Sequence, residues 1–127
     1  MAVQTKVSCY CFSKRPDEQE AKIICGYADG LICYWEKDET NKYTPTPFIG
    51  HTNRVNHIMH IPDSQYIISV SNDCTMRQWA LHTSLCERMF KFHDPLYYVM
   101  WYPVKNLLFT SCWDKQIRAI DLDTGVV

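Results

Sequence analysis

The sequence predicts an all-β fold in which a unit of about four short strands occurs three times. Short apolar runs, rich in β-branched and aromatic side chains, are separated by turn signals at intervals of about 8–12 residues. Between these signals, no window of helical length carries apolar residues at the period of an amphipathic helix. Three turn aspartates, Asp29, Asp73 and Asp114, recur at intervals of 44 and 41 residues, and such a period predicts a repeat protein.

The first unit, expected at roughly 6–49, contains four runs that read as strands. They span residues 6–12, 22–27, 31–35 and 43–49. The last run contains Pro45 and Pro47, and proline has no N–H to donate to a β-ladder. We therefore expect this strand to be irregular or to lie at the edge of a sheet.

The second and third units repeat this order and are expected at roughly 50–91 and 92–127. The runs of the second unit span residues 55–60, 66–71, 74–79 and 85–91. Those of the third unit span residues 96–102, 107–112 and 116–120, and residues 126–127 are expected to begin a last strand. A period of 41–44 residues that holds four short strands is typical of a β-propeller blade. The three units therefore predict three blades.

The middle unit carries the most specific motif. It begins with Gly50-His51, and residues 69–79 read Ser-Val-Ser-Asn-Asp-Cys-Thr-Met-Arg-Gln-Trp. With the repeat spacing, these residues resemble the WD-repeat family, and the resemblance covers nearly the whole chain. It implies a WD-repeat β-propeller of about three four-stranded blades, in which the two outer units are more degenerate than the middle one.

The resemblance also implies a structural tetrad, a set of polar residues that fastens each blade internally. In the middle unit the tetrad would be His51, Ser69, Asp73 and Trp79. The matching residues are Asp29 and Trp35 in the first unit, and His93, Thr110 and Asp114 in the third. Cys25 replaces the hydroxyl of the first unit and Ile120 replaces the tryptophan of the third, so we expect weaker outer blades. Gln78 occupies a position where the family has an aliphatic residue.

Histidine, serine and aspartate in one unit also suggest a hydrolase. A catalytic serine must be exposed beside an oxyanion hole, whereas Ser69 lies in the middle of an apolar strand. We therefore expect a non-enzymatic protein without a cofactor.

Composition narrows the classes of partner and the compartment. The formal net charge is −1, so we expect no attraction to nucleic acid and no direct contact with an anionic membrane. No apolar run approaches the roughly 20 residues that a membrane helix needs. The first residues lack the profile of a secretory signal. These features favour a cytoplasmic protein, with the nucleus as the alternative.

The seven cysteines, an odd number without a Cys-x-x-Cys pair, read as reduced thiols that pack as small hydrophobic residues. A zinc site at Cys9 and Cys11 with a histidine is the alternative, although a lone Cys-x-Cys is a weak signal. His57 and His60 could also join His51 as metal ligands, but His60 occupies an apolar position of the repeat. We expect no metal site.

Three blades are too few for a closed ring, because propellers typically have 4–8 blades. We therefore expect the chain to be part of a longer propeller. The alternatives are a homodimer, in which two copies would form one closed ring, and an open arc of three blades.

The resemblance implies that the rim of the propeller binds a protein or peptide. Rim positions lie at the start of each first strand and just before each turn aspartate. We expect partner contacts at Arg54, Asn56, Asn72, Tyr97 and Trp113. Tyrosine, tryptophan and arginine are the usual anchors of protein interfaces. The expected function is a scaffold in a multi-protein assembly whose partner and pathway the sequence does not name.

The alternative function is that of a membrane-trafficking adaptor at endosomes. Residues 41–45 and 51–55 are similar to those of propellers that carry a FYVE zinc finger and bind endosomal phosphoinositide. No zinc-finger cysteine pattern is present, so the lipid-binding part would lie outside this chain.

Overall fold

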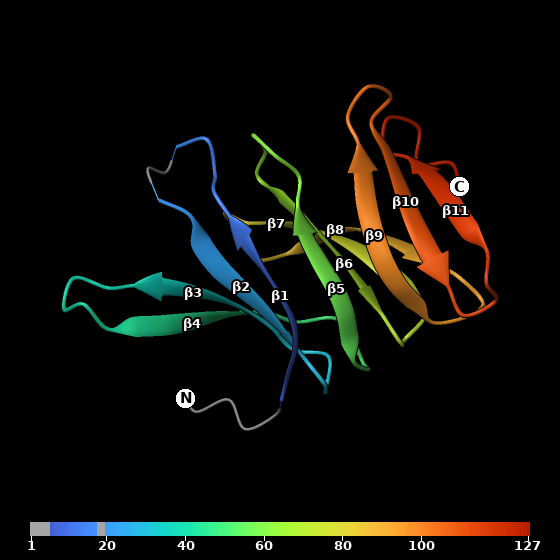
Figure 1. The fold of residues 1–127 in the computed structure, drawn as a ribbon. Helices are drawn as coiled ribbons and strands as arrows, with labels where there is room; N and C mark the ends of the chain where they lie inside the picture. Colours follow the sequence, from blue (N-terminus) through green and yellow to red (C-terminus); the bar gives the residue numbers. More distant parts are fainter. Residues whose placement is uncertain (1–5, 18–19) are drawn as a thin grey trace.

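The structure is a computed structural model that describes residues 6–17 and 20–127. These residues form eleven β-strands in three antiparallel sheets, which confirms the all-β prediction (Figure 1). Consecutive strands are neighbours in every sheet, so each sheet is a simple meander. Within the described residues, no helix is long and apolar enough to cross a membrane.

The first sheet has four strands in the order β1-β2-β3-β4. Their bounds are Val7–Ser13 for β1, Lys22–Tyr27 for β2, Ile32–Lys37 for β3 and Tyr43–Phe48 for β4. The proline-containing strand β4 lies at the edge, with Pro45 opposite Trp35 and Pro47 opposite Cys33. An edge position tolerates the two missing N–H donors, since only one side of the strand pairs with a neighbour.

The second sheet has four strands and the third has three. The second comprises β5 (Val55–His60), β6 (Tyr66–Ser71), β7 (Thr75–Ala80) and β8 (Cys86–Lys91). The third comprises β9 (Leu96–Tyr102), β10 (Leu107–Cys112) and β11 (Ile117–Asp121). The expected last strand at residues 126–127 is not formed. The carbonyl of Val126 accepts a hydrogen bond from the N–H of Asp121, but this single bond does not make a ladder.

The three sheets lie in a row with their first strands in contact. Figure 1 shows β1, β5 and β9 following one another across the centre of the molecule, and β1 and β9 both contact β5. Two apolar layers fill the spaces between the sheets. Ile24, Tyr34 and Phe48 pack against Ile67 and Trp79 between the first and second sheets. Between the second and third sheets the layer is formed by Ile68, Val70, Met76, Leu96, Val99, Leu108 and Ile120.

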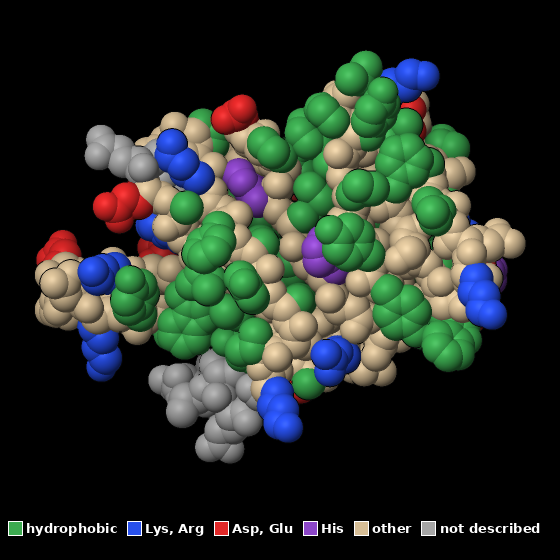
Figure 2. Space-filling view, viewed as in Figure 1, with side chains coloured by type: hydrophobic (Ala, Val, Ile, Leu, Met, Phe, Trp, Pro, Cys, Tyr) green, Lys and Arg blue, Asp and Glu red, His purple; other side chains and the backbone are tan. Residues whose placement is uncertain are grey.

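Two sheet faces at the ends of the row have no sheet packed on them within the described residues. The first end face consists of Ile23, Cys25, Tyr27, Cys33 and Trp35 on the first sheet. The third end face consists of Tyr98, Met100, Phe109 and Ile117 on the third sheet. Ile117 is 74% exposed and Met100 is 56% exposed, so the third end face is open to solvent. Figure 2 shows hydrophobic side chains gathered over β1 and β2 of the first sheet and over the third sheet.

The residue after each turn aspartate has a left-handed backbone. The φ angles are +99° at Gly30, +71° at Cys74 and +66° at Lys115. Only glycine adopts this conformation without a steric penalty from a Cβ atom. A Cβ at Gly30 would also lie 2.5 Å from the backbone oxygen of His51, so the first turn packs directly on the loop that precedes β5.

Candidate partner-binding rim

The middle sheet contains a connected set of buried and partly buried side-chain hydrogen bonds. Nδ1 of His51 lies 2.8 Å from Oδ2 of Asp73, and its Nε2 lies 2.6 Å from Oγ of Ser69. The indole N–H of Trp79 donates to the same Ser69 oxygen over 2.8 Å. Thr75 extends the set by donating its hydroxyl to Asp73 over 2.6 Å. The residues of the expected middle tetrad are therefore brought together in one network.

The carboxyl of Asp73 stays ionised inside this network. Burial alone would raise its pKa, but hydrogen bonds from His51 and Thr75 and from the backbone N–H of Thr52 outweigh burial and hold that pKa far below its usual range. A charged carboxylate accepts stronger hydrogen bonds than a neutral acid does. It also fixes the tautomer of His51, because the ring N–H then faces Asp73 and leaves Nε2 to accept from Ser69.

The same geometry leaves Ser69 unable to act on a substrate. Its side chain is fully buried, and its oxygen is already shared between His51 and Trp79. A nucleophile needs an approach path and an oxyanion hole. The hydrogen bonds of this arrangement join β6 to β7, to the turn between them and to the loop before β5.

The outer sheets do not reproduce this network. In the first, Oδ1 of Asp29 accepts from the N–H of Leu31 over 3.1 Å, and Trp35 lies on the first end face. In the third, Thr110 donates its hydroxyl to the carbonyl of Tyr98 over 2.8 Å, and Asp114 pairs with Arg118 over 2.8 Å. Among the described residues, no hydrogen bond joins His93 to Thr110 or Asp114.

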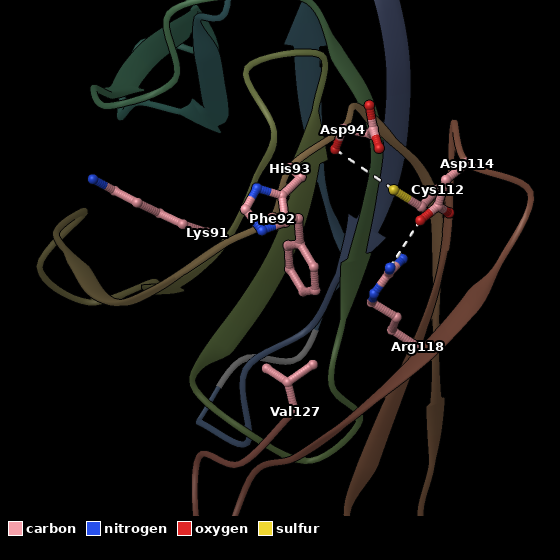
Figure 3. Close-up of a pocket in the computed structure, with 8 residues that line it drawn as sticks. All are labelled: Lys91, Phe92, His93, Asp94, Cys112, Asp114, Arg118 and Val127. Atoms are coloured by element: carbon pink, nitrogen blue, oxygen red, sulfur yellow. Dashed lines mark hydrogen bonds and ion pairs between the residues drawn. The ribbon is translucent and has the colours of Figure 1, made fainter.

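The third sheet lacks this network because two of its positions differ from those of the middle sheet. Ile120 has no side-chain N–H to donate to Thr110, and among the described residues no histidine is hydrogen-bonded to the Thr110 hydroxyl, which donates to the carbonyl of Tyr98. His93 is one residue nearer its strand than His51 is, and it lines a cavity of about 210 Å³ together with Asp114 and Arg118. Figure 3 shows His93 and Asp114 on opposite sides of that cavity.

Three possible metal ligands meet at the edge of this cavity. One donor atom each of Asp94, Cys112 and Asp114 lies within 4.8 Å of the others. The Arg118 guanidinium beside Asp114 holds the pKa of that carboxyl below its ordinary value. The Cys112 thiol donates to the backbone oxygen of Asp94 over 3.6 Å. A guanidinium already occupies the place of a cation beside Asp114, so this set does not fit a metal site.

The other proposed ligands are engaged elsewhere. Burial raises the pKa of Cys9 to about 11 and that of Cys11 to about 12. Among the described residues, neither thiol belongs to a group of three close metal-ligating side chains. His57 accepts from the N–H of Val99 over 3.2 Å, and His60 contacts the carbonyl of Ser64 over 2.8 Å. All seven cysteines are free thiols.

Some of the expected rim residues form contacts inside the protein, and others are exposed to solvent. The side-chain N–H groups of Asn56 donate to Asn72 and to the carbonyl of Leu96, each over 2.7 Å. Asn56 therefore joins the second sheet to the third and is not free for a partner. Arg54 is exposed at the start of β5.

Tyr97 and Trp113 form an exposed aromatic pair on the rim. Their ring centroids lie 6.3 Å apart at 58°, and Trp113 is 66% exposed. The N–H of Trp113 donates to the carbonyl of Pro95 over 2.9 Å, which fixes the backbone beneath the ring. The pair borders a groove of about 440 Å³ that is lined by Asn53, Asn72, Asp94, Pro95, Tyr97 and Trp113.

Three residues of this groove, Asn53, Asp94 and Pro95, are not among the contacts expected from the sequence. For Asn53 and Asp94 a signal exists, because they are 41 residues apart and thus occupy the same position of the repeat. Each lies within three residues before a first strand, on the loop that leads to the rim.

Comparisons with known proteins agree with this architecture. The family model described as "WD domain, G-beta repeat" matches residues 42–80 and 84–121, which is more than half of the chain. Pre-mRNA-processing factor 19 is 24% identical in Bos taurus and 26% in Mus musculus, over 84% of this chain and 21% of the relative. Ribosome biogenesis protein bop1-A of Xenopus laevis is 29% identical over 60% of this chain and 11% of the relative.

The chain thus spans about a fifth or less of the length of these relatives. Their names concern pre-mRNA processing and ribosome biogenesis, and they give no support to the alternative of an endosomal adaptor or to a cytoplasmic location. The repeat spacing, the stacked meander sheets and the matches to two consecutive repeats lead to one conclusion: this chain belongs to the WD-repeat family.

Proposed function

We propose that this chain is a non-enzymatic WD-repeat scaffold that binds a protein partner through the rim groove beside Tyr97 and Trp113. The exposed aromatic pair is the observation that carries the proposal. Large aromatic side chains at the centre of an interface supply much of its binding free energy. Asn53 and Asn72 line the same groove and offer polar groups to a peptide backbone.

The names of the relatives support a more specific setting. By analogy with pre-mRNA-processing factor 19 and ribosome biogenesis protein bop1-A, we propose that the partner belongs to an assembly that serves one of these two processes. The nucleus is the compartment that this setting favours.

The test is affinity purification of the tagged protein from its own cells, with quantitation of each co-purifying protein. Tyr97 and Trp113 are both changed to alanine in one variant, and exposed Leu85, which lies outside the groove, is changed to alanine in the control. We expect the rim variant to recover at least about tenfold less of a specific partner than the parent protein does. This decrease corresponds to a loss of about 1.4 kcal/mol in binding free energy. Retention of every partner by a folded rim variant would contradict the proposal.

A further inference from the structure

The geometry points to an arginine side chain of the partner as the group that the rim groove receives, with Trp113 and Tyr97 as stacking surfaces and Asp94 as counter-ion. This inference rests on the proposed rim function and specifies its ligand chemistry. The occupant is a peptide segment that presents arginine. Lysine and neutral peptides are the competing occupants that the experiment separates.

The aromatic pair provides two surfaces that suit a flat cation. The rings of Tyr97 and Trp113 are tilted by 58° with centroids 6.3 Å apart, so they form an open wedge and do not cover each other. Trp113 is 66% exposed and Tyr97 is 39% exposed, which leaves ring surface available to a ligand. A guanidinium is planar, stacks on aromatic faces and is attracted by their negative π surface.

The charges around the groove also favour a cationic ligand. Asp94 lines the groove with the aromatic pair, and one of its carboxylate oxygens lies within 4.8 Å of a carboxylate oxygen of Asp114. Figure 3 shows Asp94 and Asp114 on either side of Cys112. Arg118 pairs with Asp114 over 2.8 Å, so two carboxylates share one protein cation. Arg118 also interacts with the charge of Asp94, but a single guanidinium cannot balance both carboxylates, so a net negative charge remains for a ligand.

The remaining lining favours a cation over an anion. Among the described residues, no lysine or arginine lines this groove. The side-chain oxygen of Asn72 accepts from Asn56, which aligns its amide, and Asn53 adds a second amide. Arginine carries five N–H donors in a fixed fork and can meet a carboxylate and an amide oxygen together. Lysine offers a compact charge that stacks less well on a ring.

The experiment is a nitrogen-15 NMR titration of the whole chain with the peptide acetyl-Gly-Ala-Arg-Ala-Gly-amide. Matched peptides replace arginine by lysine or by citrulline, which keeps the shape and loses the charge. We expect the arginine peptide to shift the indole N–H signal of Trp113, and to bind about fivefold or more tightly than the citrulline peptide. We expect the lysine peptide to bind with intermediate affinity.

Two variants test the assigned roles. Trp113→Ala should weaken binding of the arginine peptide by about fivefold or more, because the stacking surface is lost. Asp94→Asn should weaken it by about two- to fivefold and remove most of the preference over citrulline. Asp63→Asn, in an exposed turn outside the groove, is the matched control and should leave the affinity unchanged.

The outcomes separate this inference from the proposed function. Equal binding of the arginine and citrulline peptides, or no binding of either, would overturn the arginine site. If the variant with Tyr97 and Trp113 changed to alanine still lost its protein partner in that case, the proposed rim function would remain supported. Tighter binding of the lysine peptide would also overturn the assignment to arginine.

Discussion

At the residue scale, Ser69 is the point on which the buried hydrogen bonds of the middle sheet converge. A hydroxyl has one proton to donate and two lone pairs that accept, so Ser69 can donate to His51 while it accepts from Trp79. The three side chains have exposed fractions of 0–7%. Because water cannot replace a lost partner there, removal of one member leaves an unsatisfied group.

The first prediction concerns the substitution Trp79→Phe. Phenylalanine keeps most of the apolar contact with Phe48 but loses the N–H that donates to Ser69. We expect the free energy of unfolding, measured by urea denaturation, to fall by about 1–3 kcal/mol. Trp113→Phe is the control and should change it by less than about 0.5 kcal/mol, since Trp113 is exposed. Equal stability of both variants would show that the tetrad assignment in the middle blade is wrong.

The second prediction concerns the pH dependence that Asp73 contributes. Its folded-state pKa is depressed, so its stabilising effect is present above the unfolded-state pKa of about 3.9 and is lost as the pH falls toward the folded-state value. We expect Asp73→Asn to lower the free energy of unfolding at pH 7 and to flatten its decline below about pH 5. Urea denaturation at pH 7, 5, 4 and 3 measures both effects.

The control for this titration is Asp63→Asn, which makes the same chemical change at an exposed turn. Its stability should follow the parent protein at every pH. If Asp73→Asn declined as steeply as the parent below pH 5, Asp73 would not be the group whose protonation destabilises the fold.

At the scale of the elements, the strands were predictable because their signals are local. The bounds of β2, β5, β6, β9 and β10 agree with those read from the sequence, and each of these strands is followed by a turn signal or proline. Side-chain alternation and turn residues act over a few positions, so they are visible in the sequence alone. The contacts of Asn56 were not predictable, because its partner Leu96 is 40 residues away.

Gln78 in β7 is a second residue whose contacts could not be predicted from the sequence. The sequence marks it as a polar residue at an aliphatic position, and the structure supplies its partner. Its side-chain oxygen accepts from Nε of Arg88 on β8 over 3.1 Å, and Nη2 of Arg88 donates to the carbonyl of Leu122 over 2.8 Å. A buried amide thus becomes part of a link between the second and third sheets.

The third prediction is a double-mutant cycle on this link. Arg88→Met leaves the buried oxygen of Gln78 without its donor, and we expect it to cost about 1–3 kcal/mol in thermal or urea unfolding. Gln78→Met in the same chain removes the orphaned group, so the double variant should lose less than the sum of the single losses. Strictly additive losses would mean that the two side chains are not coupled.

At the scale of the whole molecule, the two end faces are counterparts of faces that are buried inside the chain. Ile23 and Trp35 on the first end face match Ile67 and Trp79, which pack on the preceding sheet. The first end face also borders an open cavity of about 370 Å³. The third end face is open to solvent, whereas Cys25, Tyr27 and Cys33 of the first end face are buried although no other sheet packs on them within the described residues. The two end faces are of the kinds that meet between neighbouring sheets inside the chain.

The fourth prediction is that the purified chain associates through these faces, as two copies whose unlike end faces meet. Light scattering should give twice the mass of one 15.0 kDa chain. Ile117→Lys puts a charge on the third end face alone and should restore the single-chain mass, since both contacts of such a dimer use that face. Leu85→Lys, in an exposed loop, should not. A single-chain mass for the parent protein would refute association through the end faces.

The meander order of the strands allows a protein of this kind to become longer or shorter by whole repeats. Each described strand pairs only with its neighbours in the sequence, so no ladder within residues 6–17 and 20–127 ties one sheet to another. A duplication or deletion of 41–44 residues would therefore add or remove a whole sheet with its own hydrogen bonds complete. The sheets that become neighbours would then meet through the same two kinds of face that already pack against each other between the sheets of this chain. The number of repeats can thus change in a single genetic step while each remaining sheet keeps its register.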